Sequence, residues 1–121
     1  MKLADTHTHF YLPDYDNDRD EMVSRAVKSG VCKLLMPNVD LETVQPVLSA
    51  AEKYEDICFP MIGLHPTSIK EDFLPQLDEI IRIAAHHKFI AVGEIGIDLY
   101  WANTHRAEQM IAFRMQAEYA V

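Results

Sequence analysis

The spacing of apolar residues alternates along this chain between a strand-like and a helix-like pattern, and this alternation occurs four times. A short continuous or alternating apolar run is followed each time by a longer segment in which apolar residues recur every three to four positions. Strand–helix units in series are typical of a parallel sheet covered by helices. We expect an α/β fold with parallel strands at 3–5, 31–36, 57–62 and 89–92, and helices that begin near residues 16, 40, 74 and 104.

The number of these units limits the architecture. Four units of about 30 residues make half of a (β/α)₈ TIM barrel, which typically needs about 250 residues. An open flavodoxin-type sheet is the alternative, but its first loop is normally a glycine-rich phosphate cradle, and no such loop occurs here. We therefore expect residues 1–121 to be a partial, truncated TIM-barrel domain, its N-terminal half. Four parallel strands leave two open edges, which predicts association into a homo-oligomer.

Two histidines directly follow the first expected strand, in Asp5-Thr6-His7-Thr8-His9. Side chains alternate on an extended backbone, so His7 and His9 point the same way. Neutral imidazole is a common metal ligand, and the pair can offer two nitrogens to one cation. Asp5 shares their side and is either a third, oxygen ligand or the carboxylate that fixes an imidazole tautomer. A polar strand end without a metal is the alternative interpretation.

Other conspicuous polar residues also follow expected strands: Asn38 the second, His65 the third and Glu94 the fourth. Active sites of barrels are built at this end of the strands. Asn38 and His65 each have an ordinary explanation as turn residues. A carboxylate that ends an apolar strand, however, needs an ion pair, a hydrogen bond or a cation. Two imidazoles and Glu94 would suit a metal centre that generates hydroxide and clamps a phosphoryl or carbonyl oxygen.

Composition narrows the functional classes. The formal charge of −8 and the pI near 5.1 argue against the extended basic surface of many nucleic-acid binders, although a bound cation can itself attract a phosphate. Cys32 and Cys58 each lie in an apolar run, which predicts buried thiols in a reduced compartment rather than a disulfide or zinc pair. No run is long enough to span a membrane and the start does not resemble a secretory signal, so we expect a cytoplasmic protein without membrane contact.

Three motifs in order resemble the TatD-type metal-dependent deoxyribonucleases, which are amidohydrolase-like TIM barrels: Asp5-Thr6-His7-Thr8-His9, Gly63-Leu64-His65-Pro66 and Gly93-Glu94-Ile95-Gly96-Ile97-Asp98-Leu99-Tyr100. The resemblance implies His7, His9 and Glu94 as metal ligands, with Glu94 catalytic and shared between two divalent ions. It implies that His65 and Asp98 lie near the substrate phosphate or support the site. The implied cofactor is magnesium, or manganese or zinc, and the implied reaction is hydrolysis of phosphodiester bonds in DNA.

The chain also departs from this family, whose members carry a histidine on each of the next two strands and a late aspartate. None of these positions occurs within 121 residues, which predicts weak metal binding and leaves the activity of this chain alone open. Two other functions stay open at this stage. One is hydrolysis of an amide or lactone in a small molecule, slightly favoured by the acidic composition. The other is a non-catalytic remnant that binds a metal or a partner protein.

Overall fold

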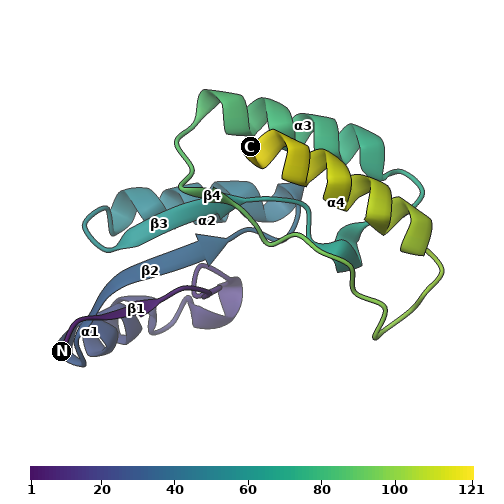
Figure 1. Ribbon diagram of the computed structural model, residues 1–121. Helices are drawn as coiled ribbons and strands as arrows, with labels where there is room; N and C mark the ends of the chain where they lie inside the picture. Colours follow the sequence, from purple (N-terminus) through teal and green to yellow (C-terminus); the bar gives the residue numbers. More distant parts are fainter.

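The computed structural model describes residues 1–121 and contains one parallel sheet with four α-helices (Figure 1). The sheet has the order β1-β2-β3-β4, and every neighbouring pair of strands is parallel, as the alternating pattern predicts. The strands are β1 (Leu3–Asp5), β2 (Val31–Pro37), β3 (Cys58–Ile62) and β4 (Ala91–Val92). The helices are α1 (Arg19–Lys28), α2 (Leu41–Lys53), α3 (Phe73–His86) and α4 (Arg106–Ala120), with short 3₁₀ helices at η1 (Pro13–Tyr15) and η2 (Pro66–Ser68).

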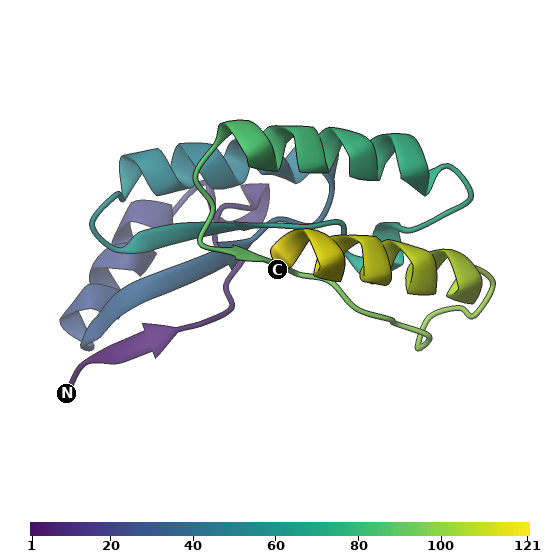
Figure 2. The same ribbon diagram turned by 45° about the horizontal axis from the view of Figure 1, so that its top comes forward.

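All four helices pack on one face of the sheet. Alternate strand residues point to this face, where Leu34, Met36 and Cys58 join side chains of α1 and α2 in one buried cluster. Ile62 joins a second cluster formed with α2, α3 and α4. In Figure 2 α4 lies beside α3. This burial drives the docking of the helices, since each fully buried aliphatic side chain stabilises the fold by about 1.5–3 kcal/mol.

The opposite face of the sheet is open. Its side chains include Lys33, Leu35, Phe59 and Met61, which are exposed or half-buried, and the Lys33 ammonium lies 5.5 Å from the centre of the Phe59 ring. β1 and β4 have no strand on their outer sides. The sheet therefore curves without closing, and the predicted association of chains through these edges stays a prediction.

A capping side chain fixes the start of α2, whereas α4 begins without one. Asp40 caps α2 as expected, because its Oδ1 accepts from the Thr43 N–H at 3.0 Å while Thr43 Oγ1 accepts from the Asp40 N–H at 2.9 Å. The first helix begins at Arg19, later than the pattern predicts, since the chain first forms η1. Thr104 is not the cap of α4, which starts after His105 without a side-chain cap bond.

The helical spacing of Met110, Phe113, Ala117 and Ala120 predicts that these residues form the buried face of α4, but α4 packs on a different face. Met110 and Phe113 are exposed, whereas Gln109, Ala112 and Gln116 are buried. Gln116 Oε1 accepts from the backbone N–H of Leu64 at 2.7 Å, and its Nε2 donates to the Leu64 carbonyl at 3.3 Å. The loop after β3 has no ladder partner for these backbone groups, so a glutamine amide satisfies them where an apolar side chain would not.

The two cysteines lie in different environments. Cys58 is buried, and burial raises the pKa of its thiol to about 12. Cys32 is exposed, so the expectation that both thiols are buried is wrong for Cys32. Leu34 is the first residue of β2 in the core cluster, and Cys32 lies outside it. None of the helices combines the length and the apolar character that crossing a membrane requires.

Candidate metal centre

His7 and His9 lie on the segment that follows β1, and several bonds hold its backbone. The Asp5 carboxylate accepts from the His7 N–H at 3.1 Å, and the Thr8 N–H donates to the Leu35 carbonyl at 3.0 Å. Further along, the Arg19 guanidinium donates to three consecutive carbonyl oxygens, those of residues 10, 11 and 12. These contacts hold a segment that otherwise lacks regular structure.

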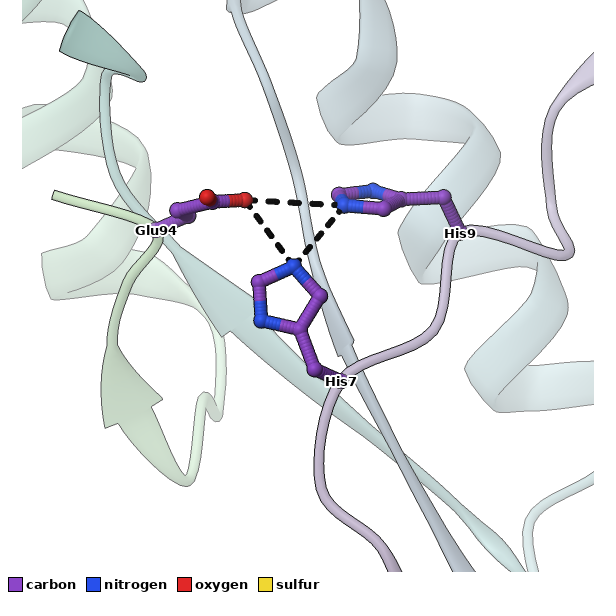
Figure 3. A group of neighbouring side chains, drawn as sticks. All are labelled: His7, His9 and Glu94. Carbon is purple, nitrogen blue, oxygen red and sulfur yellow. Dashed lines mark hydrogen bonds and ion pairs between the residues drawn. The ribbon is translucent and has the colours of Figure 1, made fainter. Parts of the chain in front are cut away.

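Glu94 reaches the same place from the loop that follows β4, at the other edge of the sheet (Figure 3). This approach depends on Gly63, because a Cβ there would lie 2.8 Å from Ile95 Cγ2 and 3.2 Å from the Glu94 carbonyl oxygen. The Gly93 N–H donates to the Ile62 carbonyl at 2.8 Å and continues the parallel pairing up to Glu94. The carboxyl ends of the first and fourth strands therefore supply one common site.

Three ligand-type atoms meet at this site. His7 Nε2 lies 3.1 Å from His9 Nε2, and Glu94 Oε2 lies 3.0 Å from His7 Nε2 and 3.5 Å from His9 Nε2 (Figure 3). Ligand atoms about 2.1 Å from one cation are roughly 3.0 Å apart at right angles and roughly 3.4 Å apart in a tetrahedron. The observed spacings match one cation held by all three side chains, and this is the one such group of three or more His, Cys, Asp or Glu residues in the structure.

Tyr11 sets the tautomer of His9. The Tyr11 hydroxyl lies 2.7 Å from the Pro37 carbonyl oxygen, which can only accept, so the hydroxyl proton is donated there. The 2.9 Å contact between Tyr11 Oη and His9 Nδ1 then requires that Nδ1 carries the ring proton. His9 Nε2 is left with a free lone pair that faces His7 and Glu94. A metal ligand needs this tautomer.

His65 has the opposite tautomer. Its Nδ1 accepts from the Thr67 backbone N–H at 3.1 Å, so in the neutral ring the proton is on Nε2. That Nε2 lies 3.2 Å from Glu94 Oε1 and donates to it. The two carboxylate oxygens of Glu94 are thus divided, with Oε2 directed at the paired histidines and Oε1 bonded to His65. His65 orients the carboxylate.

The electrostatics of the site favour neutral imidazole at His9. Burial lowers the pKa of His9, the neighbouring His7 lowers it further, and the nearby Glu94 carboxylate opposes both effects. A neutral ring is the form that binds a cation. The site therefore combines a free nitrogen lone pair at His9 with an oriented, partly exposed carboxylate.

The remaining candidate residues lie outside this group of ligand-type atoms. The carboxylate of Asp5 contacts backbone rather than an imidazole ring. Asn38 is fully buried, and its Oδ1 accepts from the Gly63 N–H at 2.7 Å, so it joins the ends of β2 and β3. Asp98 Oδ1 accepts from the Tyr100 N–H at 2.9 Å, and the side chain lines a separate cleft next to Thr67.

Tyr11 and Arg19 were missed by sequence reasoning. A tyrosine two residues after the second histidine shares the side of the paired histidines in an extended segment, and this spacing is the signal that could have identified it. Arg19 carried no comparable signal, because the partners through which it holds this segment are backbone carbonyls that any sequence would present.

Comparisons with known proteins agree with this geometry. The family model described as "TatD related DNase" matches residues 4–121. The uncharacterized metal-dependent hydrolase YabD of Bacillus subtilis is 32% identical over 94% of this chain and 44% of its own length. The 3'-5' ssDNA/RNA exonuclease TatD of Salmonella typhimurium is 30% identical over 98% of this chain and 45% of its own length.

A solved structure supports the same assignment. The crystal structure of YjjV, a TatD homologue from Escherichia coli, superimposes with a TM-score of 0.80 at 31% identity, covering 98% of this chain and 46% of YjjV. This match confirms the expected half-barrel. The chain spans less than half the length of the relatives it matches. With the family model covering nearly every residue, the chain belongs to the TatD-related DNase family.

Proposed function

We propose that this chain carries the metal-binding part of a metal-dependent phosphodiesterase that acts on DNA. The observation that supports this proposal is the meeting of His7 Nε2, His9 Nε2 and Glu94 Oε2 within 3.0–3.5 Å of one another. The name of the Salmonella relative includes activity on single-stranded DNA and RNA, and the family as a whole contains metal-dependent hydrolases and nucleases. A phosphodiester in DNA is therefore the substrate we assign first.

The donor set indicates which ion is preferred. Two imidazole nitrogens and one carboxylate oxygen suit zinc or manganese better than magnesium, which favours oxygen ligands and keeps several waters. A second ion, as the family resemblance implies, would also be held by Glu94. We propose manganese or zinc ahead of magnesium at the site formed by the paired histidines.

Each residue has a separate part in the proposed reaction. A bound divalent ion supplies an activated water and polarises a phosphoryl oxygen. His7 and His9 would hold that ion, with Tyr11 keeping the His9 proton on Nδ1. Glu94 adds negative charge through Oε2, and His65 keeps this carboxylate aimed at the paired rings. Glu94 is half-exposed, so a substrate can approach from solvent.

Metal removal tests this function directly. The 121-residue chain is incubated with an end-labelled DNA strand in manganese, zinc or magnesium, and a parallel sample contains EDTA. We expect strand cleavage with a divalent ion and none with EDTA, because the activated water depends on the ion. A lactone and an amide substrate are assayed beside the DNA. Cleavage of either one without cleavage of DNA would reject phosphodiester hydrolysis as the function.

Tyr11→Phe tests the tautomer argument. Phenylalanine keeps the ring packed but removes the oxygen that accepts from His9 Nδ1–H, so the ring loses its fixed tautomer. We expect manganese or zinc to bind about 10- to 100-fold more weakly by calorimetry, as is typical when the partner of a metal-binding histidine is removed. Tyr54→Phe is the control, since it removes a hydroxyl that contacts Asp20 and Lys53 rather than a histidine. Equal affinity of the Tyr11 variant and wild type would contradict this role.

A further inference from the structure

A cleft of about 230 Å³ lies next to the metal centre, between η2 and the loop that leads into α4. Its lining includes Thr67, Lys70, Asp98, Trp101 and His105. Thr67 connects the cleft to the metal centre, because its N–H donates to His65 Nδ1 and His65 Nε2 in turn contacts Glu94 Oε1 at 3.2 Å. The cleft is therefore connected to the metal centre through the hydrogen bonds of Thr67, His65 and Glu94.

One large aromatic side chain, Trp101, lines this cleft, and Tyr100 packs against its ring. Trp101 and Tyr100 are 79% and 84% exposed, and their rings meet edge to face with centroids 4.8 Å apart. The loop that carries them is anchored, since Gln109 Oε1 accepts from the Asp98 N–H at 2.8 Å and its Nε2 donates to the Asp98 carbonyl at 3.0 Å. Gln109 is itself buried. The rings are thus presented to solvent by a fixed loop.

The cleft is also lined by one cation, the Lys70 ammonium, and by the Asp98 carboxylate. Lys70 is exposed and forms no ion pair in the structure, in contrast to Lys53, which pairs with Asp20 at 2.6 Å. His105 adds a second basic group, whose Nε2 is 3.9 Å from the exposed Glu71 carboxylate. Lys70 and Trp101 line the same cleft, and an ammonium group beside an exposed tryptophan suits an anion with an attached ring.

We propose, resting on the function proposed above, that this cleft binds one nucleotide of a single-stranded nucleic acid. The nucleobase stacks on Trp101, the phosphate next to it pairs with Lys70, and the neighbouring phosphodiester lies at the metal centre. Stacking accepts any base, because every base presents a π-face. A single strand is required, since bases within a duplex are stacked on one another and are not free to contact the ring.

Trp101 is the only tryptophan in the chain, so its own fluorescence reports on the cleft. The wild-type chain is titrated in EDTA with a short oligothymidylate, and separately with an abasic strand of the same length. We expect saturable quenching with the thymidylate and much weaker quenching with the abasic strand, because stacking needs a base. Absence of quenching by the thymidylate, or equal quenching by both strands, would overturn the proposal.

Variants distinguish the stacking contact of Trp101 from the phosphate contact of Lys70. The affinity of each variant for a fluorescently labelled strand is measured by fluorescence anisotropy. Trp101→Ala should weaken binding about 5- to 100-fold, the usual range for a lost base–aromatic stack. Tyr119→Ala removes an exposed aromatic ring of α4 outside this cleft and should bind like wild type. Lys70→Ala should lower the slope of log affinity against log salt by about 0.7, since one phosphate contact is lost. Wild-type affinity in the Trp101 variant would refute the stacking site.

These experiments also distinguish a failure of the proposed nucleotide-binding cleft from a failure of the proposed hydrolytic function. If Trp101→Ala weakens strand binding while the wild type hydrolyses no DNA with any metal, the cleft is supported and the hydrolytic function fails. If the wild type hydrolyses DNA and Trp101→Ala leaves KM unchanged, the function is supported and the cleft is rejected.

Discussion

Glu94→Gln is expected to abolish metal binding and hydrolysis together. The amide keeps the shape of the side chain but removes the negative charge, and it offers one oxygen where the carboxylate offers two. Removing only the partner of a metal-binding histidine costs about 10- to 100-fold in affinity, so losing the one carboxylate in contact with the paired histidines should cost more than about 100-fold. Calorimetric titration with manganese and zinc measures this loss of affinity, and the strand-cleavage assay measures the accompanying loss of DNA hydrolysis.

The matched control is Glu118→Gln. It makes the same chemical change at an exposed position of α4, where Glu118 Oε1 is 3.8 Å from Arg114. Both variants have the same net charge, so a general electrostatic effect would weaken both equally. We expect the control to bind metal and cleave DNA like wild type. If the Glu94 variant binds metal as tightly as wild type, Glu94 is not a ligand of the proposed metal centre.

Gln116→Leu is expected to have the largest effect on stability. Leucine keeps a similar volume, but it leaves the buried N–H and carbonyl of Leu64 without the bonds that Gln116 makes to them. Each of these two unsatisfied buried groups costs about 1–3 kcal/mol, so the free energy of unfolding should fall by roughly 2–6 kcal/mol. This is a large fraction of the typical 5–15 kcal/mol of a small domain. Urea denaturation followed by circular dichroism measures the difference.

Gln45→Leu provides the control for this stability effect. Gln45 is exposed on α2 and contacts only the Ser49 hydroxyl, at 3.2 Å, so its replacement should change stability by less than about 0.5 kcal/mol. If both variants lose the same small amount of stability, the buried amide of Gln116 does not hold α4 to the loop after β3. The His65 segment starts from that loop, so strong destabilisation should also reduce metal affinity.

Much of the fold could be predicted from the sequence because the governing rules are local. The switch between strand and helix spacing located all four strand–helix units, and Asp40 identified the start of α2. The shared side of His7 and His9 follows from alternation along an extended chain. The position of Glu94 at the same end of the sheet follows from parallel strands, so the members of this group could be named before their contacts were seen.

The sequence-based predictions of burial fail where the environment of a residue is set by a segment distant in the sequence. Met110 and Phe113 of α4 are exposed because the buried side of the helix faces unpaired backbone at Leu64, where an amide is more favourable than an apolar group. Cys32 is exposed because it does not join the core cluster, whose buried residues in β2 are Leu34 and Met36. Neither outcome can be computed from spacing, since both depend on what another segment presents.

The sequence alone determined the order of the elements, the parallel sheet and the set of histidines and glutamate at its carboxyl end, since periodicity and capping act over a few residues. Only the tertiary structure decided the hydrogen-bonding roles within that set. Tyr11, with the Pro37 carbonyl, assigns the proton of His9 to Nδ1, and Thr67 assigns that of His65 to Nε2. Proton positions depend on which acceptor lies within about 3 Å, and folding alone brings those atoms together.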